Sequence, residues 1–142
     1  MKIRLLMLGK TRRPEMNAVL ADYVKRISRS CPIEVTEVRD AEAALKKLDA
    51  DRAASMLLLD AGGKVYDSTA FAKWLGEQRD RGTRELIFVC GDADGFPEIL
   101  RERLKQKISL SAMTYSHELA RVMLAEQLYR AFAILSGSRY PK

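Results

Sequence analysis

The chain has 142 residues, which fits one domain and leaves no room for separate catalytic and binding domains of ordinary size. With 47% apolar and 31% charged residues it is not generally disordered, and its apolar runs are far shorter than the about 20 residues of a membrane-spanning helix. Lysine and arginine outnumber aspartate and glutamate by 25 to 19, and this net charge of +6 favours a polyanionic partner such as nucleic acid. Net charge alone does not decide the matter, because many small basic proteins bind no nucleic acid.

The first part of the chain alternates between strand-like and helical patterns. Residues 2–8 are predicted to form a buried strand, and a helix follows from Pro14 to Ile27, because proline suits a first helical turn and apolar residues then recur every three or four positions. No apolar signal region precedes the strand, so we expect a cytoplasmic protein. The remaining elements of this part are a half-exposed strand near a sheet edge at 33–38, a weak helix at 41–54 and an apolar strand at 56–59.

The second part continues the alternation. A helix is predicted to start at Asp67 or Ser68 and to end at Gly82, and the strongly apolar strand 86–90 follows it. Pro97 opens a short helix, residues 108–113 form the last strand, and the longest helix runs from Ser116 to about Ser136. That helix is expected to bury Leu119, Val122, Met123, Leu128, Tyr129 and Phe132. The pattern predicts an α/β domain over residues 1–142, with a mainly parallel sheet covered by helices on both faces.

Three connections between strands and helices are candidates for a ligand site. They are residues 60–67, 91–96 and 114–117, and ligands of parallel sheets bind beyond the carboxyl ends of the strands. The pairs Gly62-Gly63 and Gly91 with Gly95 would let the backbone approach a flat ligand closely, although glycine after a strand can also be an ordinary turn residue. Together the three connections favour a pocket.

Other common sites are not indicated by the sequence. Neither a G-x-G-x-x-G motif after the first strand nor a phosphate-binding P-loop is present, and Asp92 with Asp94 lacks the rest of a calcium loop. We predict no metal site, because there is one histidine and the two cysteines, Cys31 and Cys90, have no ligand spacing. Both cysteines are expected to be reduced and buried.

The last helix carries charged residues that need an explanation. Arg121 and Arg130 lie among apolar residues, so burying them requires partners or a bound anion. Glu126 and Arg130 are four residues apart, and a solvated ion pair would account for both. His117, at the start of the helix, is either part of the pocket or a histidine that only satisfies the helix end.

The chain closely resembles the ribosomal RNA large subunit methyltransferase H family along nearly its whole length. The segments that carry the resemblance are Leu59-Asp60, Gly63-Lys64, Asp67-Ser68, Phe71-Ala72, Phe88-Val89-Cys90-Gly91, Asp94-Gly95-Phe96, Ser109-Leu110-Ser111, Met113-Thr114, His117-Glu118-Leu119-Ala120-Arg121 and Glu126-Gln127-Leu128-Tyr129-Arg130-Ala131. The family belongs to the SPOUT class, which implies an α/β fold with a trefoil knot in the C-terminal half, a homodimer and S-adenosylmethionine as cofactor. It also implies methylation at N3 of a pseudouridine in 23S ribosomal RNA, at the subunit interface of the assembled ribosome.

The resemblance also implies roles for individual residues. The cofactor positions would be Leu59, Gly91, Leu110, Ser111, Ala112, Met113, Thr114 and Tyr115. Candidates near the reaction are His117 and Arg121, with Tyr140 and Arg139 from the tail, whereas Glu126 and Arg130 are expected to be structural. The candidates for RNA phosphate contacts are Lys10, Arg12, Arg13, Arg139 and Lys142. The alternative is a noncatalytic α/β dimer that binds RNA or a nucleotide.

The sequence departs from the family pattern at two places. The family usually has a second glycine where this chain has Asp92, whose carboxylate could lie near the sulfonium of the cofactor or cap the helix at Pro97. The family also tends to end in tyrosine, histidine and a basic residue, whereas this chain ends Tyr140-Pro141-Lys142. If the terminal histidine assists the reaction in relatives, another group must do so here.

Overall fold

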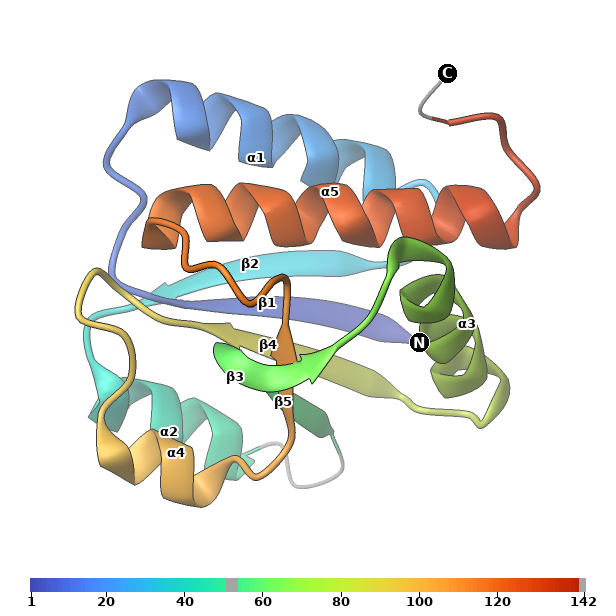
Figure 1. Ribbon diagram of the computed structural model, residues 1–142. Helices are drawn as coiled ribbons and strands as arrows, with labels where there is room; N and C mark the ends of the chain where they lie inside the picture. The colour runs from blue at the N-terminus through green and yellow to red at the C-terminus, as the bar shows by residue number, and fades with distance from the viewer. Residues whose placement is uncertain (51–53, 141–142) are drawn as a thin grey trace.

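A computed structural model describes residues 1–50 and 54–140 of the chain. Its centre is a five-stranded sheet with the order β2-β1-β4-β3-β5, and every pair of neighbouring strands is parallel (Figure 1). The strands are β1 (Lys2–Leu8), β2 (Ile33–Val38), β3 (Ser55–Val65), β4 (Glu85–Cys90) and β5 (Lys107–Ser109). The parallel α/β fold is therefore confirmed, with β2 at one edge as expected from its half-exposed pattern.

Helices cover both faces of the sheet. In Figure 1, α1 (Pro14–Ile27), α3 (Ser68–Asp80) and α5 (His117–Leu135) lie over one face, and α2 (Ala41–Ala50) and α4 (Glu98–Arg103) lie over the other. Alternate residues of a strand point to opposite faces, so β1 serves two cores. Ile3, Leu5 and Met7 pack with the first group of helices, and Leu6 and Leu8 pack with the second.

Several helix boundaries follow from local chemistry. Asp67 precedes α3, and its carboxylate accepts a hydrogen bond from the Ala70 amide at 2.7 Å. Ser116 precedes α5 and accepts in the same way from the Leu119 amide at 3.4 Å. Gly82 lies just past the end of α3 with a φ of +85°, a backbone conformation that favours glycine. These caps confirm the expected boundaries. The predicted helix 41–54 ends at Ala50, and residues 51–53 lie outside the described part of the chain.

The third and fifth strands differ from the prediction. β3 continues through Val65 instead of ending at Leu59, because β5 pairs with it twice: Ile108 lies opposite both Leu59 and Lys64. Residues 60–63 bulge between the two pairings. β5 ends at Ser109 instead of Met113, since the Ser109 hydroxyl bonds the main chain of Ser111 and turns the chain away from the sheet. The trefoil knot implied by the resemblance stays a prediction.

The buried side of α5 agrees in part with the prediction: Leu128 and Phe132 are buried, and Val122 and Tyr129 are partly buried against the core. Leu119, expected to be buried, is 38% exposed, and Arg121 is instead completely buried. The helix is apolar on nearly every side, so its sequence pattern does not reveal which side faces the sheet. Among residues 1–50 and 54–140, no helix has the length and apolar character needed to cross a membrane.

Candidate functional site

A cavity of about 430 Å³ opens beside the bulge of β3 and at the carboxyl ends of β4 and β5. The three expected connections meet there, although they are separated by long stretches of sequence. The cavity is lined by Leu59, Asp60, Ala61, Cys90, Gly91, Asp92, Ala93, Gly95, Phe96, Ser109, Leu110, Ser111, Met113, Thr114, Tyr115, Ser116, His117 and Ala120. Its position is where ligands of open parallel sheets bind.

Most of the residues expected to hold the cofactor line this cavity. They are Leu59, Gly91, Leu110, Ser111, Met113, Thr114 and Tyr115. Ala112 is the expected position that does not line it. Sequence reasoning missed several others, among them Asp60 and Phe96, although both lie inside or directly beside the connections that had been singled out.

The β5–α5 connection forms one wall of the cavity and is shaped by serine hydroxyls. The Ser111 hydroxyl accepts a hydrogen bond from the Met113 amide at 3.0 Å, and Ser116 caps the following helix. This turn leaves Met113 74% exposed at the wall of the cavity. An apolar side chain so exposed provides a surface for a flat aromatic ligand.

The glycines of the site are explained by the packing of the chain against itself. A Cβ at Gly91 would lie 2.9 Å from the Gly95 carbonyl oxygen, and one at Gly63 would lie 2.7 Å from the main chain of Ile108. Neither Gly62 nor Gly63 lines the cavity, so the expectation that this pair approaches a ligand is wrong. Gly91 does line it, and its lack of a side chain lets the turn of residues 91–95 close.

Two carboxylates lie in the cavity wall. Asp60 pairs with Arg101 at 3.0 Å and also accepts a hydrogen bond from the Gly62 amide. Asp92 accepts from the amide of Asp94 at 2.9 Å. No side chain caps the start of α4 at Pro97, so the prediction that Asp92 caps this helix is wrong. Among the described residues, no lysine or arginine lines the cavity.

Cys90 lies at the base of the cavity and is not suited to be a nucleophile. Its side chain is 1% exposed, and burial raises the pKa of its thiol to about 12. The thiol is therefore protonated at neutral pH, and only the thiolate is strongly nucleophilic. Both cysteines are free and buried, as expected.

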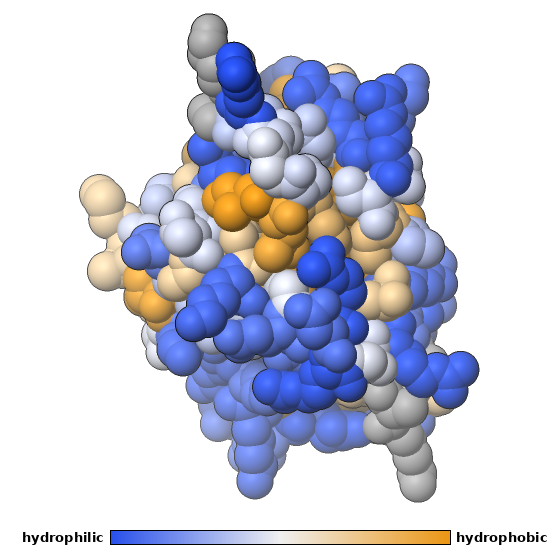
Figure 2. All heavy atoms as spheres, turned by 90° about the vertical axis from the view of Figure 1, so that its right-hand side faces the viewer, coloured by the Kyte–Doolittle hydropathy of each residue, from blue (hydrophilic) through white to orange (hydrophobic). Residues whose placement is uncertain are grey.

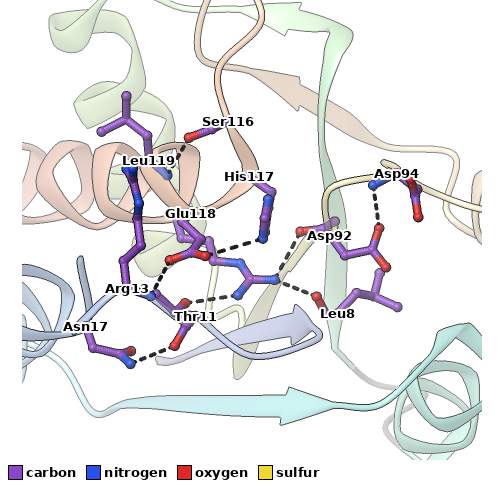
Figure 3. Close-up of polar contacts among 12 residues, drawn as sticks. Leu8, Thr11, Arg13, Asn17, Asp92, Asp94, Ser116, His117, Glu118 and Leu119 are labelled. Atoms are coloured by element: carbon purple, nitrogen blue, oxygen red, sulfur yellow. Dashed lines mark hydrogen bonds and ion pairs between the residues drawn. The ribbon is translucent and has the colours of Figure 1, made fainter. Parts of the chain in front are cut away.

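Arg121 joins three segments beneath the cavity. Its guanidinium donates to the carbonyl oxygens of Leu8 and Gly91 and to the Thr11 hydroxyl (Figure 3). Burial lowers the pKa of Arg121 below its ordinary value. The side chain is fully buried and does not line the cavity. Arg121 thus bonds the end of β1 to the end of β4, and the partners of its buried guanidinium are two main-chain carbonyl oxygens and the Thr11 hydroxyl.

His117 and Glu118 are the first two residues of α5 and lie between the cavity and the loop that follows β1. His117 lines the cavity, and its Nε2 lies 3.8 Å from a carboxylate oxygen of Glu118. Glu118 accepts a hydrogen bond from the Arg13 amide at 3.0 Å, and this bond lowers the pKa of the Glu118 carboxyl. In Figure 3 a dashed line joins the side chains of His117 and Glu118. His117 is the expected catalytic candidate that does lie at the cavity.

Tyr140 lies away from the cavity of its own chain. It donates a hydrogen bond to Glu126 at 2.9 Å, and its ring packs edge-on against Tyr129. Glu126 is nine residues beyond His117, about 14 Å along the helix axis. Burial, with hydrogen bonds to Tyr23 and Glu126, raises the pKa of the Tyr140 phenol, so it stays protonated. The expectation that Tyr140 acts beside His117 is therefore not met within one chain.

Glu126 and Arg130 form the expected pair of the last helix. Their side chains are joined by hydrogen bonds, and these raise the pKa of the Arg130 guanidinium. The guanidinium also lies over the Tyr140 ring, 5.1 Å from its centroid. The pair thus holds the chain end against α5, which is a structural role.

The basic residues proposed for RNA contacts are exposed in two places. Lys10, Arg12 and Arg13 lie between β1 and α1, and Arg139 follows α5. Hydrogen bonds hold the loop between β1 and α1 in place. The Thr11 amide donates to the Glu37 carboxylate at 3.0 Å, and the Asn17 side chain donates to the Thr11 carbonyl. Lys142 lies outside the described residues.

A second, smaller cavity of about 180 Å³ lies at the amino ends of the strands. It is lined by Met1, Ser30, Cys31, Arg79, Phe132, Leu135 and Ser136. Figure 2 looks onto this end of the molecule and shows hydrophobic surface near the centre, surrounded by hydrophilic side chains. None of the predicted site residues lies in this cavity.

The sequence matches known methyltransferases over nearly its full length. A family model described as "Predicted SPOUT methyltransferase" matches residues 1–141. The chain is 41% identical over 151 aligned residues to ribosomal RNA large subunit methyltransferase H of Pelobacter propionicus, and the match covers 99% of both chains. The protein of the same name from Solibacter usitatus is also 41% identical, over 140 residues and 99% of both chains.

Solved structures of methyltransferases share the fold. A tRNA methyltransferase from Aquifex aeolicus aligns with a TM-score of 0.58 and 15% identity, over 91% of this chain and 69% of that one. The SpoU methyltransferase AviRb from Streptomyces viridochromogenes, solved in complex with AdoMet, aligns with a TM-score of 0.52 and 13% identity, over 96% of this chain and 61% of that one.

Proposed function

Because this chain belongs to the ribosomal RNA large subunit methyltransferase H family of SPOUT methyltransferases, we propose that it methylates N3 of a pseudouridine in 23S ribosomal RNA with S-adenosylmethionine, on the assembled ribosome. The observation that carries the proposal is the meeting of seven expected cofactor residues in one cavity, beside the bulge of β3 and at the carboxyl ends of β4 and β5. The chain would act as a single domain in the cytoplasm, where ribosomes are.

The cavity fits an adenosyl cofactor in size and lining. Its volume of about 430 Å³ lies within the ordinary range for small-molecule sites, about 300–1,000 Å³. Leu59, Leu110 and Met113 would contact the adenine, and the main chain at Gly91 would approach it closely. When bound, the cofactor supplies an electrophilic methyl group on a positive sulfur atom.

The protein's own contribution to this reaction would be positioning and the handling of one proton. Transfer to a ring nitrogen is an in-line displacement, so holding the two reactants in place supplies much of the acceleration. The N3 proton must leave, and His117 is the imidazole in the cavity wall that can accept it. Arg121 would act as a positioning residue, because its bond to the Gly91 carbonyl fixes the cavity wall.

We propose that the enzyme works as a homodimer. Apolar side chains of α1, α5 and the cavity wall remain exposed in one chain, namely Val19, Leu119, Met113 and Tyr115. Exposed apolar groups of this kind favour contact with a second copy. Tyr140 lies far along α5 from its own cavity, so a role for it near the substrate requires the cavity of the partner.

The RNA would be held through its phosphates and through the surface of the ribosome. The loop that carries Lys10, Arg12 and Arg13 is tied to the same arginine that supports the cavity, through Thr11. Phosphate contacts from this loop would therefore keep a fixed relation to the cofactor. A chain of this size has little additional surface for RNA, which favours a preformed ribosomal site.

A noncatalytic binding protein is the competing function, because the tail ends Tyr140-Pro141-Lys142 without the histidine that the family resemblance leads us to expect. Calorimetric titration with S-adenosylmethionine separates the two. A binding heat with one site per chain supports the enzyme, and no heat supports a plain RNA-binding dimer.

The decisive experiment is transfer of labelled methyl to ribosomes from a strain that lacks the modification. We expect label in 23S RNA, at N3 of a pseudouridine after digestion and mass analysis, with assembled ribosomes as better substrates than naked RNA. Label on protein, or no label although the cofactor binds, would contradict the proposed function.

A further inference from the structure

We propose that Asp92 makes the cavity discriminate between the positively charged methyl donor and its neutral product, so that the product is held less tightly than the donor. The inference rests on the proposed function and adds a specificity-determining residue to it. Asp92 directly follows Gly91 at the end of β4 and lines the cavity.

The carboxylate of Asp92 is oriented by its own loop. One of its oxygens accepts a hydrogen bond from the Asp94 amide at 2.9 Å, as Figure 3 shows. The main-chain carbonyl of Asp92 accepts from the Gly95 amide at 3.0 Å, which closes the turn. The side chain is therefore held in place before any ligand arrives, while the residue as a whole remains exposed to the cavity.

The charges around the cavity leave the carboxylate of Asp92 available. The other acidic residue of the lining, Asp60, is neutralised by its ion pair with Arg101. The buried Arg121 donates to Leu8, Thr11 and Gly91, and not to Asp92. Within residues 1–50 and 54–140, no lysine or arginine lines the cavity or forms an ion pair with Asp92. The Asp92 carboxylate thus faces the cavity without an ion pair, and its electrostatic interaction with the buried Arg121 guanidinium is through space.

The donor and the product differ by one positive charge. S-adenosylmethionine and S-adenosylhomocysteine share the adenosine, the amino group and the carboxyl group, but only the donor has a sulfonium. Loss of the methyl group converts the sulfonium to a neutral thioether. A carboxylate near the sulfur position attracts the first and not the second, so methyl transfer itself weakens the hold on the ligand.

Calorimetric affinities of the wild-type protein and Asp92→Asn for three ligands test this inference. The ligands are S-adenosylmethionine, S-adenosylhomocysteine and sinefungin, an analogue with an ammonium group near the sulfonium position. Asparagine is of the same size and its carbonyl oxygen can still accept from the Asp94 amide, so the turn is kept. The matched control is Asp94→Asn, which removes the same charge from the same loop outside the cavity lining.

We expect Asp92→Asn to weaken S-adenosylmethionine and sinefungin about fivefold, which corresponds to about 1 kcal/mol, and to leave S-adenosylhomocysteine unchanged. Asp94→Asn should change none of the three affinities. Added salt should reduce the preference for the donor in the wild-type protein and not in Asp92→Asn, because screening acts on the charge contact.

Three results would overturn the inference. If Asp92→Asn lowers the affinity for all three ligands equally, Asp92 either contacts the amino group that they share or only supports the loop. No change for any ligand would show that the carboxylate does not face the bound cofactor. If the wild-type protein binds none of the three, the proposed function fails with it, whereas the first two results leave that function intact.

Discussion

The side chain of Arg121 is fully buried together with its positive charge. Its guanidinium bonds two main-chain carbonyl oxygens and the Thr11 hydroxyl. Its partners come from β1, the following loop and the end of β4, which are brought together only by the fold. A buried charge is costly unless its hydrogen bonds are satisfied, and a buried carbonyl without its donor is costly as well. The side chain therefore supports both the basic loop and the floor of the cavity.

Replacing this arginine should destabilise the protein strongly. We expect Arg121→Met to lower the free energy of unfolding by about 3–5 kcal/mol, because the Leu8 and Gly91 carbonyls lose their donor. Urea unfolding followed by circular dichroism measures the change. Arg12→Met, an exposed control in the adjacent loop, should stay within about 0.5 kcal/mol of wild type. Equal stability of the two variants would contradict the support role.

Glu118 makes stability depend on pH in the acid range. The hydrogen bond from Arg13 lowers the pKa of the folded Glu118 carboxyl below the unfolded value of about 4.3. Its stabilising contribution is therefore complete above that value and is lost as the pH falls through the lower folded pKa. We expect the melting temperatures of wild type and Glu118→Gln to differ at pH 6 and to converge near pH 3. A constant difference would contradict this origin.

The elements meet so closely at two glycines that their main chains nearly touch. Gly91 lies against Gly95 within one turn, and Gly63 lies against Ile108 where β3 passes β5. The twofold pairing of β5 with β3 depends on this second contact. The cavity is thus shaped by approaches of backbone to backbone that leave no space for a side chain.

A side chain at Gly91 should disrupt the cavity. We expect Gly91→Val to weaken S-adenosylmethionine at least tenfold, because the turn to Gly95 must open, and to cost about 1–3 kcal/mol of stability. Gly76→Ala is the control: its new methyl group would meet only the flexible end of Leu135, away from the cavity, so cofactor affinity should be kept. Calorimetry measures both, and unchanged affinity in Gly91→Val would show that the cofactor binds elsewhere.

The elements show what local sequence can and cannot specify. Asp67 and Gly82 mark the ends of α3 because the cap and the turn depend on neighbouring residues only. The extension of β3 beyond Leu59 was not predictable, because it depends on pairing with a strand about 45 residues later. The same holds for Arg121, whose partners lie more than 100 positions away in β1 and its loop.

The candidate site was largely predictable because its residues follow consecutive strands of one sheet. Leu59, Gly91 and Met113 lie in or beside three such connections, and parallel topology brings these to one edge. Tyr140 could not be placed, since nothing in the tail indicates that it folds back along α5. The sequence identifies Asp92 as a departure from the family pattern. The orientation of its carboxylate could not be predicted, because it depends on a hydrogen bond from the Asp94 amide.

The whole molecule combines a positive net charge with exposed apolar residues, among them Val19 on α1 and Leu119 on α5. Both properties are expected of a protein that binds RNA and also a second copy of itself. Leu119 is 38% exposed at the start of α5, and Ile99 is 51% exposed on α4, which covers the other face of the sheet. Leu119 lies on the proposed dimer surface, and Ile99 lies on the opposite side of the sheet. Ile99 is therefore a suitable control for a substitution at Leu119.

A charge at the proposed dimer surface should separate the subunits. We expect Leu119→Asp to weaken the dimer at least tenfold, because two like charges would be buried near each other, while aspartate in the first helical turn keeps α5 intact. Ile99→Asp should leave the dimer unchanged. Sedimentation across a range of concentrations measures the association, and a dimer that resists the first change but not the second would place the interface on the α2–α4 face.

The central claim is that the bulge of β3 and the connections after β4 and β5 form the cofactor cavity. A crystal structure of the protein with S-adenosylmethionine tests it most directly. We predict that the adenosine lies between Leu59, Gly91 and Met113, with the sulfonium on the Asp92 side. An ordered ligand in the smaller cavity at Cys31 and Phe132, or at any other place on the surface, would contradict the claim.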